Sequence, residues 1–230
     1  MATKNEKVTF DDALQSGSFL EKNKKKFSAL VIAILIIVAG FFCYQEFVNG
    51  PRQQKASTAL ARGQEYFQAE QFDKALNGDG AGYAGFVKIA SDYSSTDAGN
   101  LANLYAGLCY ANLGKWQNAV DYLQNFSTKN DALVSPAATA ALGNAYAHIG
   151  QIDKAISELK DAASKADSEA KDGTSNSLSP TFLLQAGELL ESQNKKDDAL
   201  KIYQDIKKKY VNAPFVQSGD IDKYIERVTK

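Results

Sequence analysis

Few residues in this chain could carry catalytic or metal chemistry. The sequence has one histidine, His148, and two cysteines, Cys43 and Cys109. Zinc sites and histidine-based acid–base catalysis need more material than this. The chain also lacks the phosphate loop G-x-x-x-x-G-K-[ST], the nucleophile elbow G-x-S-x-G, the zinc helix H-E-x-x-H and any C-x-x-C pair. The sequence therefore predicts no cofactor, no metal site and no enzymatic activity.

Two smaller features have an ordinary structural interpretation. Gly78-Asp79-Gly80, preceded by Asp73, superficially resembles a calcium loop, but the ligand spacing fails and no glutamate closes it. We interpret the stretch as a turn that lets a helix restart. His148 could respond to pH, although a lone histidine is usually a surface side chain. We expect Cys109 to be a small buried residue.

The composition describes a folded protein without a strong charge bias. Of 230 residues, 44% are hydrophobic and 23% charged, the formal net charge is −1 and the sequence pI is about 5.9. Such a chain is neither broadly disordered nor a basic nucleic-acid binder.

An apolar segment stands out near the N-terminus. Residues 27–48, FSALVIAILIIVAGFFCYQEFV, carry one charge, Glu46. A helix of this length spans about 33 Å, enough for the hydrocarbon core of a bilayer. We predict a transmembrane helix that breaks at Asn49-Gly50-Pro51. A cleaved signal peptide, a lipoprotein signal and a buried core helix are less favoured, because no small-residue cleavage site follows and the run is unusually long.

The flanking charges predict the orientation. Four lysines lie between positions 22 and 26, whereas Arg52 and Lys55 are the only nearby cations on the other side. The positive-inside rule places residues 1–26 in the cytoplasm and residues 49–230 in the periplasm of a bacterial inner membrane. Ala29 and Ala33, four positions apart, are a candidate contact face for another membrane helix.

The outer segment contains an internal repeat. Gly107, Tyr110, Gly114 and Ala119 recur 36 residues later at Gly143, Tyr146, Gly150 and Ala155. Gly187 and Ala199 continue the pattern after an insertion, and Gly63 and Ala75 begin it upstream. Each copy has two amphipathic stretches of helical period joined by a short turn. Glycine in mid-helix costs roughly 1 kcal/mol against alanine, so its recurrence predicts close approach of a neighbouring helix. The expected copies cover about 56–93, 100–133, 136–165 and 180–213, with a capping helix at 218–229.

This spacing, G-x-x-Y…G-x-[WI]-x-x-A…L, resembles the tetratricopeptide repeat, lengthened by two residues. The first copy departs most, with Arg62 at a usually apolar position and Asn77-Gly78-Asp79-Gly80 interrupting its second helix. The resemblance implies an α-solenoid. Together with the apolar segment, it predicts an all-α fold: a single N-terminal transmembrane helix followed by an α-solenoid with a C-terminal capping helix. Such solenoids expose an extended binding surface.

The resemblance to tetratricopeptide repeats also implies a binding groove lined by the first helix of each copy. No Lys or Arg occupies these positions, which argues against a clamp for a terminal carboxylate. For Leu104 and Leu108, simple packing between repeats is an equally good interpretation. The implied groove residues are Leu60, Gln64, Phe67, Leu104, Leu108, Asn112, Asn144, Ala147, His148, Leu184, Glu188 and Glu191.

The whole layout of a basic tail, one membrane helix and about four outer repeats is similar to YfgM-like proteins of Bacteroidetes-type bacteria. That resemblance implies an ancillary subunit of the Sec translocon that works with a membrane-anchored prolyl-isomerase chaperone. A scaffold of another envelope machine, in outer-membrane assembly or cell division, would share the same sequence features. A catalytic or metal-dependent periplasmic domain is the third hypothesis.

Overall fold

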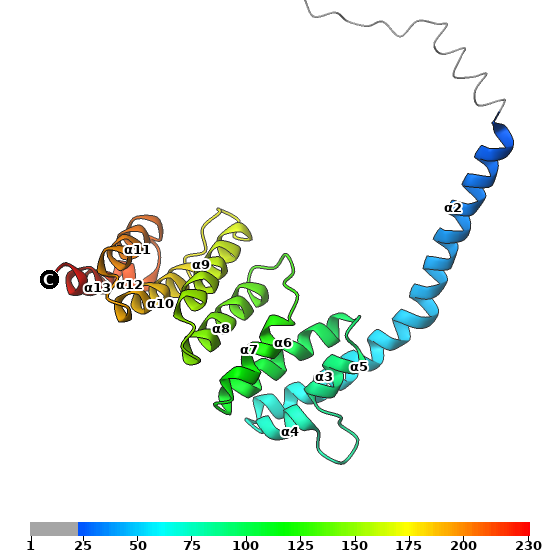
Figure 1. Cartoon of the computed structure of the whole chain (residues 1–230), viewed down its shortest axis with the longest axis horizontal. Helices are drawn as coiled ribbons and strands as arrows, with labels where there is room; N and C mark the ends of the chain where they lie inside the picture. The colour runs from blue at the N-terminus through cyan, green and yellow to red at the C-terminus, as the bar shows by residue number, and fades with distance from the viewer. Residues whose placement is uncertain (1–22) are drawn as a thin grey trace, which may run out of the picture. The chain divides into compact units, whose positions relative to one another are not determined.

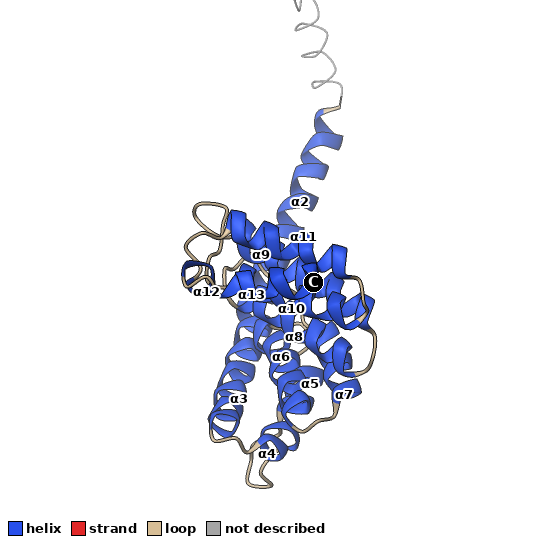
Figure 2. Ribbon diagram, turned by 90° about the vertical axis from the view of Figure 1, so that its left-hand side faces the viewer, coloured by secondary structure: helices blue, strands red, loops and turns tan. Residues whose placement is uncertain are grey.

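The computed structural model of the chain describes residues 23–230; the predicted cytoplasmic tail lies almost entirely outside them. Two compact units are present, one ending at Arg52 and the other formed by Gln53–Lys230. The described part consists of helices and loops without a strand, which confirms the all-α prediction (Figure 2). In chain order the elements are α2 (Lys24–Tyr44), η1 (Gln45–Asn49), α3 (Gly50–Gln68), α4 (Phe72–Asn77), α5 (Phe86–Asp92), α6 (Asp97–Asn112), α7 (Trp116–Gln124), α8 (Val134–His148), α9 (Ile152–Ser168), α10 (Ser179–Ser192), α11 (Lys196–Lys209), α12 (Pro214–Gln217) and α13 (Asp220–Thr229).

Helix α2 is apolar and unburied. None of its most apolar stretch is buried. Within the described residues, the continuous helical stretch Lys24–Gln68, which begins with α2, is the one helix long and apolar enough to cross a membrane. The predicted break at Asn49-Gly50-Pro51 is wrong, because Gln45–Asn49 form a π-helical turn and α3 begins at Gly50. Pro51 has no N–H to donate and would crowd the carbonyl of a regular α-turn, and a wider turn accommodates it without ending the helix.

The second unit is a solenoid of helix pairs, as predicted. From α6 onward, each first helix packs against its own second helix and against the second helix of the preceding repeat (Figure 1). Three clusters of buried apolar side chains run along the unit, one centred on each stretch of neighbouring repeats. This one-dimensional core is what stacked repeats require, since no single pair can bury its own apolar face. The four pairs are α3 with α4 and α5, α6 with α7, α8 with α9, and α10 with α11.

Small residues let the paired helices approach closely. A methyl group on Gly107 would lie 2.6 Å from Cγ of Leu123, and one on Gly143 would lie 3.1 Å from the carbonyl oxygen of Ala155. The space beside Gly187 is filled by the ring of Tyr203. Close approach therefore explains the recurring glycines. The alanines that recur on the second helices, Ala75, Ala119, Ala155 and Ala199, are all fully buried.

The first repeat is interrupted at the predicted position. Helix α4 ends at Asn77, and the chain loops before α5 begins. Asp79 organises this loop: it accepts hydrogen bonds from the backbone N–H groups of Ala81 and Tyr83 at 2.8 and 2.9 Å. Tyr66 and Arg62 donate to its other oxygen at 2.8 and 2.6 Å. These donors, with the backbone N–H of Tyr83 foremost, hold the pKa of Asp79 far below its usual range. The carboxylate thus serves the turn between two helical segments.

The C-terminal end of the solenoid is covered by α13, as predicted. Helix α13 packs on α11, and its Ile221 and Val228 are buried in the same core cluster as Tyr203 and Ile206. Polar residues such as Lys223 and Glu226 lie on the outer side. The cap therefore hides the last core face from solvent.

Candidate protein-binding face

The predicted groove residues occupy repeated places on the four first helices, but their exposure differs. The most exposed groove residues stand one or five positions after the repeated glycine. Buried are Leu60 and Leu104; half-buried are Gln64, Phe67, Leu108, Ala147, Leu184 and Glu191; exposed are Asn112, Asn144, His148 and Glu188. We call these four exposed residues the first-helix face.

The α3 end of the predicted groove is engaged in packing. The Gln64 side-chain amide donates to the Tyr105 hydroxyl at 2.9 Å, and the Phe67 ring packs edge-on against Tyr105. Leu60 lies in the first core cluster and Leu104 in the next. For Leu104 the structure therefore favours packing between repeats, and these side chains offer little surface to a partner.

The centre of the face is accessible and chemically mixed. The Asn112 amide donates to the backbone carbonyl of Leu108 at 2.9 Å. The His148 ring stacks on Trp116 with centroids 3.6 Å apart and planes within 3°. Asn144, one turn before His148, is exposed. An amide and a flat aromatic pair can bind the backbone and side chains of an extended peptide without requiring a fixed sequence.

The α10 end of the predicted groove is less acidic than its sequence suggests. Both carboxylate oxygens of Glu191 accept hydrogen bonds from Arg227 at 2.6 and 2.8 Å, and the Tyr203 hydroxyl donates to it at 2.5 Å. Burial raises the pKa of Glu191, but these hydrogen bonds outweigh it and the pKa is lowered. Glu191 thus holds the cap, and Glu188 remains the exposed acidic group of the pair.

Several other residues singled out in the sequence lie outside the face. Within residues 23–230, no group of three or more His, Cys, Asp or Glu side chains is placed to hold a metal ion. Cys109 is buried, as expected, and burial raises the pKa of its thiol to about 12. Ala29 and Ala33 are exposed on α2. Their proposed role in contacting another membrane helix stays a prediction.

The structure adds one feature that the pattern analysis did not identify and one that it identified only in part. The Trp116–His148 stack joins residues 32 positions apart, and no local spacing announces it. A hollow beside α3, lined by Lys55 and Arg62, was signalled in part, because Arg62 occupies a position that is usually apolar.

Comparison with known proteins supports a repeat protein. Residues 53–215 match the family described as "T7SS, ESX-1 secretion system protein EccA1, N-terminal domain". A putative kinesin light chain of Podosopora anserina, described as having nearly identical TPR-like repeats, matches in structure with a TM-score of 0.53 at 12% identity. The match covers 77% of this chain and 94% of that one, and a single-substitution variant of the same protein matches equally well. At this identity the likeness shows the fold alone, a solenoid of tetratricopeptide type. No curated protein matches.

Proposed function

We propose that this chain, which belongs to the family of the ESX-1 secretion system protein EccA1 N-terminal domain, is a membrane-tethered scaffold. Its proposed role is to bind other proteins that take part in protein export. The observation that carries the proposal is the exposed first-helix face on a tetratricopeptide-type solenoid, in a chain that also contains an apolar helix. Solenoids of this type bind partners along such faces. The proposal involves no enzymatic step.

The tether is α2. Its length and hydropathy suit a bilayer. The lysines before it outnumber the cations directly after it, which supports a cytoplasmic N-terminus and a periplasmic repeat unit at a bacterial inner membrane. A tether keeps the repeat unit at a high effective concentration near other membrane proteins, so weak contacts at the face suffice for binding.

The proposed partners are subunits of the Sec translocon and a membrane-anchored prolyl-isomerase chaperone. This part rests on the resemblance to YfgM-like proteins. The secretion system named in the family description is a second, independent link to protein export. The amide and aromatic character of Asn144, His148 and Trp116 suits contacts to a flexible or extended segment of such a partner.

Affinity purification of the full-length protein from its own cells in mild detergent, followed by mass spectrometry, tests this function. We expect translocon and chaperone subunits in amounts comparable to the protein. An Asn144→Arg, His148→Ala variant should lose them, whereas Lys160→Ala, an exposed change on α9, should retain them. Recovery of outer-membrane assembly or division factors instead would overturn the export assignment and support the other envelope machine. Recovery of no partner by any form would overturn the scaffold itself.

A further inference from the structure

One side of α3 differs from the same side of every later first helix. Lys55, Thr58 and Arg62 stand eight, five and one residues before the repeated Gly63, and all three are exposed. In the later repeats the equivalent residues are small or apolar. All of these equivalent residues are buried except Leu142, which is half-buried. They are Gly99, Ser135 and Ser179 at the place of Lys55; Ala102, Ala138 and Phe182 at the place of Thr58; and Ala106, Leu142 and Ala186 at the place of Arg62.

In the later repeats this side is covered by the second helix of the preceding repeat. The Ser179 hydroxyl oxygen on α10 lies 2.9 Å from the carbonyl oxygen of Ala163 on α9. A side chain at Gly99 would collide with the backbone of Tyr93, just after α5. Helix α8 packs on α7 in the same way. Within Gln53–Lys230 no helix precedes α3, so the equivalent place beside it is open.

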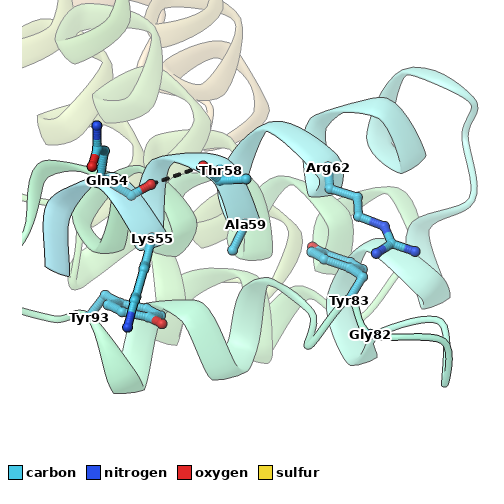
Figure 3. Close-up of a pocket in the computed structure, with 8 residues that line it drawn as sticks. All are labelled: Gln54, Lys55, Thr58, Ala59, Arg62, Gly82, Tyr83 and Tyr93. Carbon is cyan, nitrogen blue, oxygen red and sulfur yellow. Dashed lines mark hydrogen bonds between the residues drawn. The ribbon is translucent and has the colours of Figure 1, made fainter. Parts of the chain in front are cut away.

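The open place is a trough of about 540 Å³. One wall is α3, with Lys55, Thr58, Ala59 and Arg62, and the opposite wall carries Tyr83 and Tyr93 (Figure 3). Lys55 extends toward Tyr93 at one end, and Arg62 lies near Tyr83 at the other. Seven residues of helix separate the two cations, about 10 Å along the axis. The small Ala59 leaves room between them.

Each end of the trough carries a basic side chain that can donate to a partner. Arg62 forms an ion pair with Asp79 through one guanidinium nitrogen at 2.6 Å, but its side chain stays 44% exposed, and its other N–H groups can donate to a second carboxylate. In the described part of the chain, Lys55 forms no ion pair. Anionic groups about two helical turns apart would therefore complement the trough.

We propose that the trough binds an acidic α-helix of a partner protein, which packs on α3 as the missing second helix of a preceding repeat. The partner helix would place Asp or Glu residues two turns apart opposite Lys55 and Arg62, with small or apolar residues between them against Ala59. This inference rests on the proposed scaffold function and adds a second binding surface, distinct from the first-helix face.

Neither another copy of this chain nor its own tail fits the trough as well. Head-to-tail stacking of two copies would need an open second helix at the other end, and α13 covers α11 there. Residues 1–22 would lie across the membrane in the proposed topology. A partner helix meets both the geometric and the charge requirement.

Fluorescence anisotropy on the full-length protein in phosphatidylcholine nanodiscs tests the proposal with two labelled peptides. Both peptides are alanine- and leucine-based helices. The glutamate peptide carries two glutamates seven positions apart, and the lysine peptide carries two lysines at the same positions. We expect the glutamate peptide to bind at least tenfold more tightly than the lysine peptide. Lys55→Glu should reverse this preference, whereas Lys201→Glu, the same charge change at an exposed site on α11, should leave it unchanged.

Equal binding of both peptides, or the same loss in both variants, would overturn the proposal. Displacement of the glutamate peptide by a large excess of glycerol 3-phosphate would identify a phospholipid headgroup as the occupant and would also overturn it. The peptide test can fail while the affinity purification still recovers partners that depend on the first-helix face. That result would overturn the proposal for the trough but not the proposed scaffold function.

Discussion

Asp167 illustrates how single side chains join repeats in this solenoid. It lies near the end of α9 and is nearly buried. Its oxygens accept hydrogen bonds from Ser179 at 2.6 Å, the backbone N–H of Ser175 at 2.8 Å, Lys209 at 2.5 Å and Tyr210 at 2.7 Å. Burial raises the pKa of Asp167, but these donors outweigh it and the pKa is lowered. The third and fourth repeats are thus connected through one carboxylate.

Replacing this carboxylate should destabilise the protein in a pH-dependent way. Asp167→Asn keeps one acceptor oxygen for four donors, and we expect a loss of about 3 kcal/mol at pH 7. A carboxylate with a lowered folded-state pKa contributes stability above its unfolded pKa of about 3.9, and this contribution is lost as pH falls through the folded value. The difference in thermal midpoint between wild type and variant should therefore shrink below about pH 4.

The matched control is Asp161→Asn. Asp161 is exposed and pairs with Lys165 one turn away on the same helix, so its loss should cost less than about 0.5 kcal/mol. Equal effects of the two changes, or a pH-independent loss at Asp167, would contradict the assigned role.

At the residue scale, the sequence predicted which positions recur in the repeats better than it predicted side-chain contacts. The recurring glycines and alanines were found because their spacing repeats. The contacts of Asp167 with Tyr210 and of Glu191 with Arg227 join residues far apart in the chain, and no local pattern encodes them. Glu191 was therefore placed in the groove, although its carboxylate serves the cap.

At the element scale, helix pairing depends on how tightly each glycine is covered. At Gly187 an added methyl would meet the buried ring of Tyr203, whose hydroxyl is held by Glu191. Gly187→Ala should therefore cost about 1–3 kcal/mol in overpacking, more than the helix propensity gained. Differential scanning calorimetry of the full-length protein would measure the loss.

Gly143→Ala provides the contrast within the same fold. Its nearest contacts would be 3.1–3.2 Å, which small shifts can relieve. The gain of roughly 1 kcal/mol in helix propensity should offset them, and stability should stay nearly unchanged. If Gly143→Ala were the more damaging change, close approach would not be the reason for the repeated glycine.

The cap should protect its neighbours locally. Ile221 is fully buried between α13 and the core of the last repeat. Ile221→Ala should cost about 2–4 kcal/mol. Because repeats interact with their nearest neighbours, amide exchange should accelerate in α11 and α13 and stay unchanged in α6 and α7. Acceleration spread evenly over the whole unit would contradict this nearest-neighbour description.

The sequence also determined most elements, for a physical reason. Two helices and a turn repeat at nearly constant spacing, so one correct register predicts all copies. The first copy was the exception. The π-turn before Pro51 was not predicted, because proline indicates a break more readily than an adjusted helix. The trough beside α3 depends on the absence of a covering helix, which a search for recurring residues does not detect.

At the scale of the whole molecule, the proposed function divides the work between an apolar helix and a solenoid. In that proposal the solenoid offers faces for partners, and the helix, as a membrane anchor, supplies proximity. Individual contacts between the solenoid and a partner can be weak if the anchor keeps both at the same membrane. Partner binding should therefore depend on the anchor as well as on the face.

Site-specific photocrosslinking in native membranes tests this claim most directly. The probe is placed at Asn144 on the first-helix face or at Lys160 on α9, in the full-length chain and in a chain with residues 27–48 replaced by a secretion signal. We predict adducts with protein-export subunits from Asn144 in the anchored chain, few from Lys160, and a strong loss of the Asn144 adducts without the anchor. Equal adducts from both positions, or adducts that persist undiminished without the anchor, would contradict the account of a membrane-tethered scaffold.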